Sequence, residues 1–288
     1  MPRRQLTELT GQLKKARDLA KAQNRSRYRQ TRVEGSQAVR ELLTEYPQLV
    51  RDVYATEAVL ADHPDIVELL RAQDPYTHIL PDELSNRVAP SAQGLFAVID
   101  LPAQTELSQL LAEEPNLLLC AAEVQDPGNL GTMIRSAAAA GASGVILGAG
   151  SVEIFSPKVI RASAGAIFHL PVCAGGEVLQ IITQVQAAGI QVLAADGAGR
   201  YDLGQLLRAT WQSSFTSADA AALAPDTTVE LSKPTMWLIG NEARGLSAAQ
   251  VSAADAPVRI PMQRATESLN AAMAATLCLY ASAQAQHR

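Results

Sequence analysis

The sequence predicts an α/β protein in which a mostly parallel sheet follows a small mixed α/β unit. From residue 117 onward, short apolar segments typical of buried strands alternate with segments of helical spacing. Such alternation favours a parallel sheet with helices on both faces. Before residue 103 the strand and helix patterns are fewer and mixed, and 288 residues are enough for two domains.

The small unit is expected to contain two helices and two strands. Apolar residues recur at near-helical spacing in the first helix, and Pro102 closes the last strand. Residues 103–116 are expected to form a helical linker. The expected helices are 37–46 and 66–72, and the expected strands are 50–55 and 94–101.

The large unit, residues 117–288, is expected to hold the parallel sheet and its ligand. Ligands of such sheets bind beyond the carboxyl ends of the strands. A stretch rich in Ser, Ala and Thr at about 210–233 interrupts the pattern and is expected to be a flexible insertion. The expected strands are 117–123, 144–147, 169–173, 191–196, 236–240 and 258–262, and the expected helices are 130–140, 158–163, 177–188 and 269–284.

Composition excludes several classes of protein. Hydrophobic residues make up 48% and charged residues 18% of the chain, which argues against wholesale disorder. The apolar runs are shorter than the roughly 20 residues of a membrane helix, and the N-terminus lacks the apolar segment of a secretory signal. Cys120, Cys173 and Cys278 are scattered, which argues against a disulfide framework or a zinc site. We therefore expect a cytoplasmic protein with neither a membrane partner nor a metal.

Charge is distributed unevenly along the chain. Residues 1–32 hold ten basic and two acidic side chains, a local charge of +8, and the remainder carries −13. We expect residues 1–32 to form a basic N-terminal arm, and a basic arm on an acidic body favours a polyanionic partner such as nucleic acid. A solvated helix face or a fraying terminus is the alternative interpretation.

The first segment with candidate chemistry is 125–147. Asp126-Pro127-Gly128 is typical of a turn, and Asn129 is expected to cap a helix that begins at Leu130. Arg135 is the only charge in that helix, toward the end that faces the carboxyl ends of the strands. A guanidinium there suits a phosphate, although an arginine extending from a packed helix to solvent explains it equally well.

Two further segments place polar residues after expected strands. In 236–247 a strand leads into Gly240, Glu242 and Arg244, for which a local ion pair between the last two is the simpler interpretation. In 258–283 Ser268 and Asn270 precede an Ala-rich helix, and ordinary capping explains either residue alone. Together, the three loops predict a ligand site at one edge of the sheet.

These segments resemble the three motifs of the SpoU (TrmH-type) RNA ribose 2′-O-methyltransferases, within the SPOUT class. The resemblance extends from about 117 to 280, and residues 26–101 resemble the ribosomal-protein-like RNA-binding domain of many members, expected here at 33–102. Three ordered motifs are far more specific than a single glycine loop. The matching stretches are NLGTMIRSAAAAG (129–141), LIGNEARGLS (238–247) and IPMQRATESLNAAMA (260–274), with SPKVIRASAGAIFHLPV (156–172) between the first two.

The resemblance implies a deep trefoil knot in the C-terminal part of the sheet, with S-adenosylmethionine bound in the knot. It also implies a homodimer formed through the knotted domain, with RNA rather than DNA as the partner. The implied catalytic residues are Arg135, Asn129, Glu242, Ser268 and Asn270. The implied cofactor-binding residues are Leu238, Ile239, Gly240, Ile260, Met262, Ser268 and Leu269.

A ribose hydroxyl is a poor nucleophile, so its proton must leave as the oxygen attacks the methyl group. Because an arginine normally stays protonated, Arg135 is expected to hold the neighbouring phosphate and to stabilise the developing alkoxide. Deprotonation is then assisted by that phosphate, or by Arg135 itself if the arginine is strongly perturbed.

The expected function is S-adenosylmethionine-dependent 2′-O-ribose methylation of structured RNA, with 23S-type large-subunit rRNA as the leading substrate. The alternatives are a tRNA 2′-O-methyltransferase and a non-catalytic RNA-binding ribosome-assembly factor with the same fold. Antibiotic resistance by rRNA methylation is a narrower version of the leading function. A nucleotide-dependent oxidoreductase, suggested by residues 141–150, lacks the expected GxGxxG turn.

Overall fold

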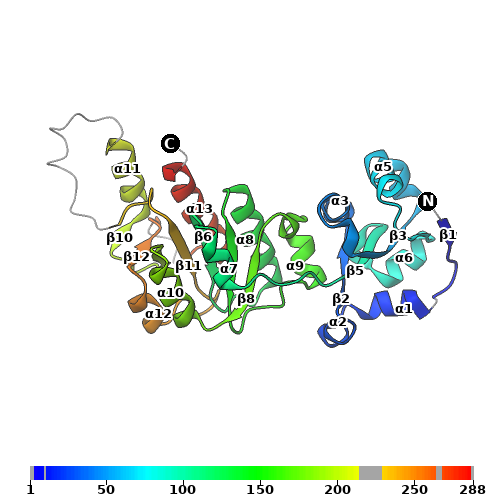
Figure 1. Cartoon of the computed structure of the whole chain (residues 1–288), viewed down its shortest axis with the longest axis horizontal. Helices are drawn as coiled ribbons and strands as arrows, with labels where there is room; N and C mark the ends of the chain where they lie inside the picture. The colour runs from blue at the N-terminus through cyan, green and yellow to red at the C-terminus, as the bar shows by residue number, and fades with distance from the viewer. Residues whose placement is uncertain (1–2, 10, 214–228, 264–267, 287–288) are drawn as a thin grey trace. The chain divides into compact units, whose positions relative to one another are not determined.

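The computed structural model describes residues 3–9, 11–213, 229–263 and 268–286. The chain divides into two compact units, and each is built from two stretches of sequence (Figure 1). The small unit comprises Met1–Ala103 and Glu153–His169, and the large unit comprises Gln104–Val152 and Leu170–Arg288. Among the described residues, no helix is long and apolar enough to cross a membrane.

The small unit contains a mixed sheet with the strand order β1-β4-β3-β5-β2 in its described part. β1, β4 and β3 are parallel, whereas β5 is antiparallel to both β3 and β2. The strands are β1 (Arg3–Gln5), β2 (Gln30–Glu34), β3 (Val50–Ala55), β4 (Thr77–Ile79) and β5 (Leu95–Asp100). The α-helices are α1 (Gly11–Asp18), α2 (Ala22–Tyr28), α3 (Ser36–Glu45), α4 (Glu57–Asp62), α5 (Pro64–Gln73), α6 (Asp82–Val88) and α9 (Pro157–Ala162), and the 3₁₀ turns are η1 (Pro47–Leu49), η2 (Pro90–Ala92) and η3 (Ala166–Phe168).

Residues 3–32 are part of the small unit rather than a separate arm. β1 pairs with β4, and the apolar side of α1 lies in the core. Leu13, Ala16 and Leu19 are buried in a cluster that also contains Phe96 and Leu84. The boundary expected between residues 32 and 33 therefore does not exist in the fold, because α1 supplies core side chains that charge counting overlooks.

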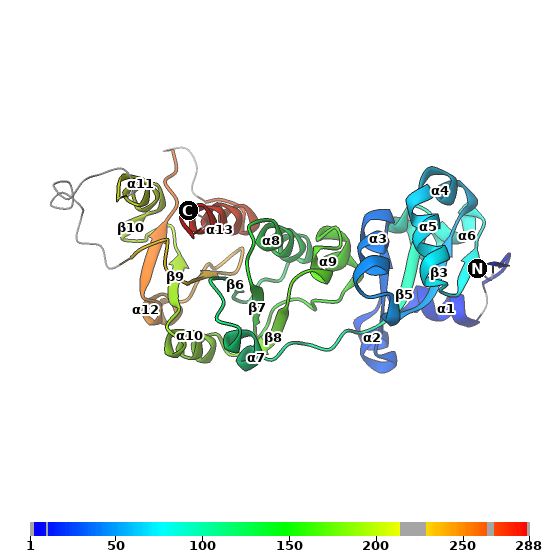
Figure 2. The same cartoon turned by 45° about the horizontal axis from the view of Figure 1, so that its top comes forward.

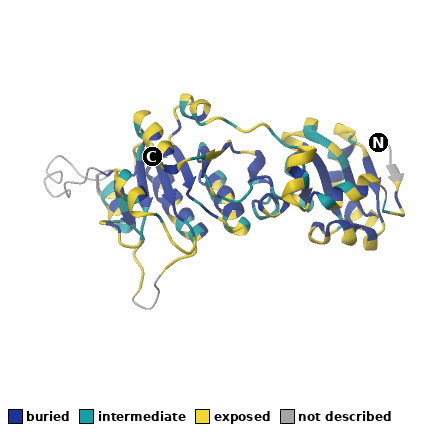
Figure 3. Cartoon of the chain, turned by 90° about the horizontal axis from the view of Figure 1, so that it is seen from below, coloured by how far each residue is buried: buried dark blue, intermediate teal, exposed yellow. Residues whose placement is uncertain are grey.

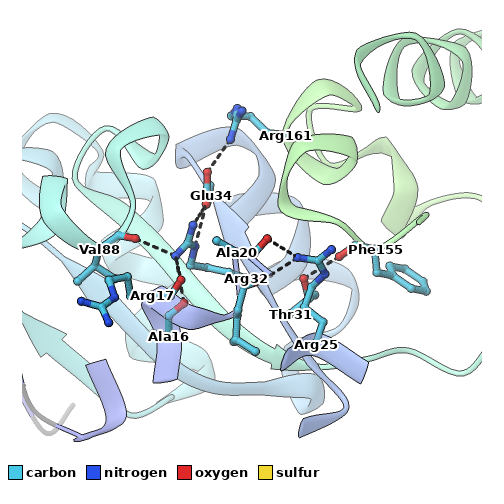
Figure 4. Close-up of polar contacts among 11 residues, drawn as sticks. Ala16, Arg17, Ala20, Arg25, Thr31, Arg32, Glu34, Val88, Phe155 and Arg161 are labelled. Atoms are coloured by element: carbon cyan, nitrogen blue, oxygen red, sulfur yellow. Dashed lines mark hydrogen bonds and ion pairs between the residues drawn. The ribbon is translucent and has the colours of Figure 1, made fainter. Parts of the chain in front are cut away.

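The segment 153–169 lies between two strands of the large sheet in sequence but packs in the small unit. The hydroxyl of Thr31 in β2 donates a hydrogen bond to the carbonyl of Phe155 at 2.7 Å. Arg161 of α9 donates to the buried carboxylate of Glu34 at 2.6 Å (Figure 4). The small unit is therefore completed by residues that the sequence assigned to the large unit.

The large unit has a sheet that is parallel throughout its described strands, in the order β10-β12-β9-β11-β6-β7-β8. The strands are β6 (Leu117–Ala121), β7 (Gly144–Gly148), β8 (Val172–Gly176), β9 (Gln191–Ala195), β10 (Tyr201–Asp202), β11 (Thr235–Ile239) and β12 (Ala256–Arg259). The helices are α7 (Leu107–Ala112), α8 (Pro127–Ala139), α10 (Val178–Ala187), α11 (Leu203–Ser213), α12 (Ala248–Ala253) and α13 (Ala271–Gln286).

Helices cover both faces of this sheet, with α8 and α13 on one side and α7, α10 and α12 on the other (Figure 2). Side chains of one strand alternate between the faces. In β11, Met236 and Leu238 join the cluster under α10, while the buried Trp237 donates its indole N–H to Ser282 of α13 at 2.9 Å. The strands consequently form the buried centre of the unit (Figure 3).

The six strands expected in this unit are present, with ends that shift by a few residues. The structure adds β10, α11 and α12, which the sequence analysis did not anticipate. The expected linker contains α7, which belongs to the large unit. Of the insertion expected at 210–233, residues 214–228 lie outside the described part, residues 210–213 continue α11, and Val229 and Leu231 are buried.

Candidate active site

Loops that follow β9, β11 and β12 surround a pocket of about 280 Å³ in the large unit. All three strands are parallel neighbours, so their carboxyl ends meet at the same edge of the sheet. Most of the wall is apolar or backbone, and two carboxylates, those of Asp196 and Glu242, lie among the lining residues. The lining residues are Ala195, Asp196, Gly197, Ile239, Gly240, Asn241, Glu242, Ala243, Gly245, Val258, Ile260, Met262, Ser268, Leu269, Ala271 and Ala274.

One wall of the pocket is a tight turn after β11. The backbone of Asn241 pairs with that of Gly245 in both directions, at 3.1 and 2.8 Å. A Cβ atom on Gly240 would lie 2.3 Å from the carbonyl carbon of Gly245, so this turn closes only with glycine at position 240. The Asn241 amide fixes the turn further, because its Nδ2 donates to the carbonyl of Glu123 at 2.8 Å.

Three residues that the sequence analysis singled out form a chain of hydrogen bonds at this edge. Asn270 Nδ2 donates to Asn129 Oδ1 at 2.9 Å, and Asn129 Nδ2 donates to Glu242 Oε1 at 3.1 Å. Asn270 Oδ1 also accepts from the amides of Ala272 and Met273 at the start of α13. The loops after β6, β11 and β12 are therefore joined through side chains, which we call the Asn129–Glu242–Asn270 chain.

Glu242 is held as an anion within this chain. Glu242 is exposed, and its partial desolvation would raise its pKa, but the hydrogen bonds from Asn129 and from backbone amides, including those of Asp126 and Gln125, outweigh this effect and lower the pKa below its usual value. A carboxylate with a lowered pKa is a weak proton acceptor near neutral pH. Its chemistry is therefore to orient Asn129 and the loop before α8.

The start of α8 differs from the expectation. The helix begins at Pro127, and its N-cap is Asp126, whose carboxylate accepts a hydrogen bond from the backbone amide of Asn129 at 2.8 Å. Asp is a preferred N-cap and Pro is favoured in the first helical position, so a helix that starts at Pro127 is more favourable than one that starts at Leu130. Because Asn129 does not cap the helix, its side chain forms hydrogen bonds with Glu242 and Asn270.

Arg135 is exposed on α8 and is not part of the pocket wall. It lies six residues beyond Asn129, which corresponds to about 9 Å along the helix axis. Ser268 and Leu269 line the pocket, as do Ile239, Gly240, Ile260 and Met262, whereas Leu238 is fully buried in the core under α10. The ion pair considered between Glu242 and Arg244 is replaced by one between Arg244 and Glu123 at 3.0 Å.

The contribution of β9 to the pocket was not predicted from the sequence. Asp196 and Gly197 follow this strand directly and line the pocket. The rule that placed the other three loops applies equally here, since Asp196 is the polar residue that ends an expected buried strand. Asn241 lies within the second motif but was given no role there, although its side-chain amide donates to the Glu123 carbonyl and accepts from the Ala243 amide to hold the turn closed.

The pocket suits S-adenosylmethionine in the chemistry of its lining. Apolar side chains from β11 and β12 fit an adenine ring, and the carboxylates of Asp196 and Glu242 suit the positive charges of the amino and sulfonium groups. Gly197 and Gly245 leave open space where side chains would otherwise project. Among the described residues there is no cluster of His, Cys, Asp and Glu that could hold a metal ion.

Comparison with known proteins agrees with this geometry. The chain is 35% identical over 189 residues to a 23S rRNA (uridine(2479)-2′-O)-methyltransferase of Streptomyces viridochromogenes, spanning 64% of this chain and 58% of that protein. It is 28% identical, over 86% of each chain, to a 23S rRNA (guanosine(2553)-2′-O)-methyltransferase of Bacillus subtilis. A crystal structure of AdoMet-bound rRNA methyltransferase from Sinorhizobium meliloti superposes with a TM-score of 0.77 at 25% identity, covering 98% of both chains.

The α/β fold, with a small mixed unit before a parallel sheet, is confirmed. The family model that matches this chain covers residues 116–280 and includes all three motif loops. The chain belongs to the SpoU rRNA methylase family.

Proposed function

We propose that the protein is an RNA 2′-O-ribose methyltransferase that uses S-adenosylmethionine and acts on large-subunit rRNA in the cytoplasm. The observation that carries the proposal is the Asn129–Glu242–Asn270 chain beside a pocket of suitable chemistry. Membership of the SpoU family and the 23S rRNA substrates of the two relatives support the choice of RNA. Three buried free cysteines agree with a reducing compartment.

S-adenosylmethionine, when bound, supplies an electrophilic methyl group. Ile239, Gly240, Ile260, Met262, Ser268 and Leu269 would hold it in the pocket. Asn129 and Asn270, fixed by Glu242 and by the start of α13, then present polar groups to the attacking ribose. Positioning of this kind can contribute much of the rate of a two-substrate transfer.

Arg135 is the residue to which we assign the phosphate beside the target ribose. It is the exposed cation of α8. A guanidinium binds phosphate through paired hydrogen bonds and stabilises negative charge that develops on the ribose oxygen. The ribose proton then passes to an oxygen of that phosphate, because the protonated guanidinium has no acceptor for it.

The protein is proposed to act as a homodimer through α8 and α13. Met273, Leu277 and Tyr280 are 63%, 47% and 41% exposed and recur at helical spacing along α13. α13 packs beside α8, where Ser136 and Thr276 share a hydrogen bond at 2.7 Å, so the exposed sides of both helices point away from the sheet. In the proposed dimer, these three side chains pack against the same side chains of a second copy, and each Arg135 then lies near the other copy.

The dimer has a direct test in analytical ultracentrifugation of wild type and Leu277→Glu. The wild type is expected at twice the chain mass and the variant at the chain mass, because a charge among these side chains opposes their burial. A monomeric wild type would contradict the dimer.

The function is tested by methyl transfer from radiolabelled S-adenosylmethionine to total RNA that lacks this modification. Sizing the labelled RNA separates the substrate classes. Label in large-subunit rRNA supports the proposal, and label in small RNA assigns the enzyme to tRNA. A protein that binds S-adenosylmethionine but labels no RNA, including RNA from assembling ribosomes, would be a non-catalytic RNA-binding factor.

A further inference from the structure

The basic side chains of residues 11–32 divide into an internal and an external group. Arg25 and Arg32 are each only 4% exposed, and both are used inside the small unit. Arg25 pairs with Glu153. Arg32 pairs with Glu34 and donates to the carbonyls of Ala16 and Val88 (Figure 4). These two arginines hold the fold together and are not available to a polyanion.

The external group surrounds the corner between α1 and α2. Arg17 has a carboxylate partner in Asp18, and Lys15 is half-buried. The exposed basic residues of this corner are Lys14, Arg17, Lys21, Arg27 and Arg29. The positive surface that residues 11–32 provide is therefore smaller than the charge count implies, and it lies on this corner.

An exposed aromatic ring lies within this basic corner. Tyr28, the last residue of α2, is 39% exposed. Lys15 Nζ lies 4.6 Å from the centre of its ring, and the guanidinium carbon of Arg27 lies 5.4 Å from it. Asp100 is near enough to Lys15 to influence it, but this carboxylate is already bound by Arg51 and Gln30.

The corner is held in place by internal contacts. Arg25 Nη1 donates to the carbonyls of Leu19 and Ala20, both at 2.8 Å, and Asn24 Nδ2 donates to the carbonyl of Asp18 at 2.9 Å. These bonds close the turn between α1 and α2, and Leu19 is fully buried beneath it. The ring of Tyr28 is thus presented by a rigid support, which reduces the ordering cost of a ligand.

We propose that Tyr28, Lys15 and Arg27 form a binding site for an unpaired nucleobase of the RNA substrate. The base stacks on the ring of Tyr28, and the two cations move from the ring to the phosphates on either side of the base. Base–aromatic stacking is typically stronger than an exposed cation–π contact, so the exchange is favourable. The site lies in the small unit, apart from the pocket, and its role in substrate capture rests on the proposed function.

The test measures binding of a short fluorescent single-stranded RNA and of a matched RNA duplex to the full-length protein, at one salt concentration for the tyrosine variants and over a series of salt concentrations for wild type and Lys15→Gln. The variants are Tyr28→Ala, Tyr28→Phe and, as a matched control, Tyr76→Ala, since Tyr76 is a 50% exposed tyrosine of the same unit beside His78. Thermal unfolding of each variant checks that the fold is retained.

Tyr28→Ala is expected to weaken single-strand binding about tenfold and to leave duplex binding unchanged. Tyr28→Phe keeps the ring and is expected to bind within about twofold of wild type, as is Tyr76→Ala. Lys15→Gln is expected to lower the slope of log affinity against log salt by about 0.7, the value for one phosphate on a single strand. Unchanged single-strand binding by Tyr28→Ala, or equal losses in the Phe and Ala variants, would overturn the stacking site.

A methyl-transfer assay with the same proteins separates this inference from the proposed function. Loss of single-strand binding in Tyr28→Ala, in a protein that methylates no RNA, would support the stacking site and contradict the function. Full single-strand binding by Tyr28→Ala, in a protein whose wild type methylates rRNA, would support the function and contradict the stacking site.

Discussion

Replacing Glu242 with Gln tests whether the Asn129–Glu242–Asn270 chain organises the active site. The carboxylate accepts from Asn129 Nδ2 at 3.1 Å, from the amide of Asp126 at 3.2 Å and from that of Gln125 at 3.4 Å. A glutamine has one acceptor oxygen, and its own N–H groups would face at least one of these donors.

Hydrogen bonds to a charged group contribute about 1.5–3 kcal/mol each when short, but these are long and Glu242 is exposed. We therefore expect the free energy of unfolding to fall by about 1–2 kcal/mol, which lowers the melting temperature by about 2–6 °C. Loss of alignment of Asn129 and Asn270 is expected to lower kcat by about tenfold to a hundredfold.

Thermal unfolding and methyl transfer of Glu242→Gln are compared with those of Glu123→Gln. Glu123 is a carboxylate of the same edge whose partner is the exposed Arg244, so its loss is expected to cost at most about 1 kcal/mol and little activity. Equal behaviour of the two variants in both assays would refute the role given to Glu242.

The pH dependence of the same pair of proteins follows from the lowered pKa of Glu242. Its contribution to stability is present above the pKa of an unfolded glutamate and is lost as the pH falls through the lower folded value. The difference in melting temperature between wild type and Glu242→Gln is therefore expected to be full at neutral pH and to shrink in acid. A difference that grows in acid would contradict the assigned ionisation.

Three other variants or reagents test separate parts of the account. Gly240→Ala forces a Cβ against Gly245 and is expected to abolish S-adenosylmethionine binding measured by calorimetry, whereas retained affinity would contradict the tight turn. Glu34→Ala leaves two arginines unpaired, one of them buried, and is expected to lower the unfolding free energy in denaturant by about 3–5 kcal/mol; a loss below about 1 kcal/mol would contradict the network. Burial raises the pKa of Cys120 to about 12 and that of Cys278 further, so a thiol reagent at pH 8 is expected to label neither residue in the folded protein, and rapid labelling would contradict their burial.

The strands of the large sheet could be predicted because each is a buried apolar run between polar loops. β6, β7 and β11 are buried along their whole length and β9 in its three central residues, a pattern that is typical of a parallel sheet. The edge strand β10 has only two residues, both half-buried, and offered no such signal. The trefoil knot follows from family membership and not from any local pattern in the chain.

The organisation of the small unit could not be predicted, because it depends on contacts between distant residues. Glu34 and Arg161 are 127 positions apart, and no local pattern indicates that a segment between two strands of one sheet completes another unit. The charge count also overestimated the basic surface, because Arg25 and Arg32 are buried and bind carboxylates and carbonyls of the small unit. The apolar spacing of Leu13, Ala16 and Leu19 was the one local indication that residues 1–32 are part of the core.

The candidate site was predicted in its polar residues but not in its internal order. Asn129, Glu242 and Asn270 were identified from the motifs, while their hydrogen bonds to one another arise only when three loops meet. Arg135 lies apart from this chain on an exposed helix surface, so the role that we propose for it needs RNA and, in the proposed dimer, a second copy of the protein.

The most direct test of the central claim maps the methyl group introduced by wild type, Arg135→Ala and Arg135→Lys into unmodified rRNA. Alkaline hydrolysis leaves a 2′-O-methylated linkage intact, and S-adenosylmethionine binding is measured in parallel. The account predicts one alkali-resistant position with wild type, its loss with Arg135→Ala, a strong reduction with Arg135→Lys, and unchanged cofactor binding in all three. Methylation at a base, or near-normal transfer by Arg135→Ala, would contradict it.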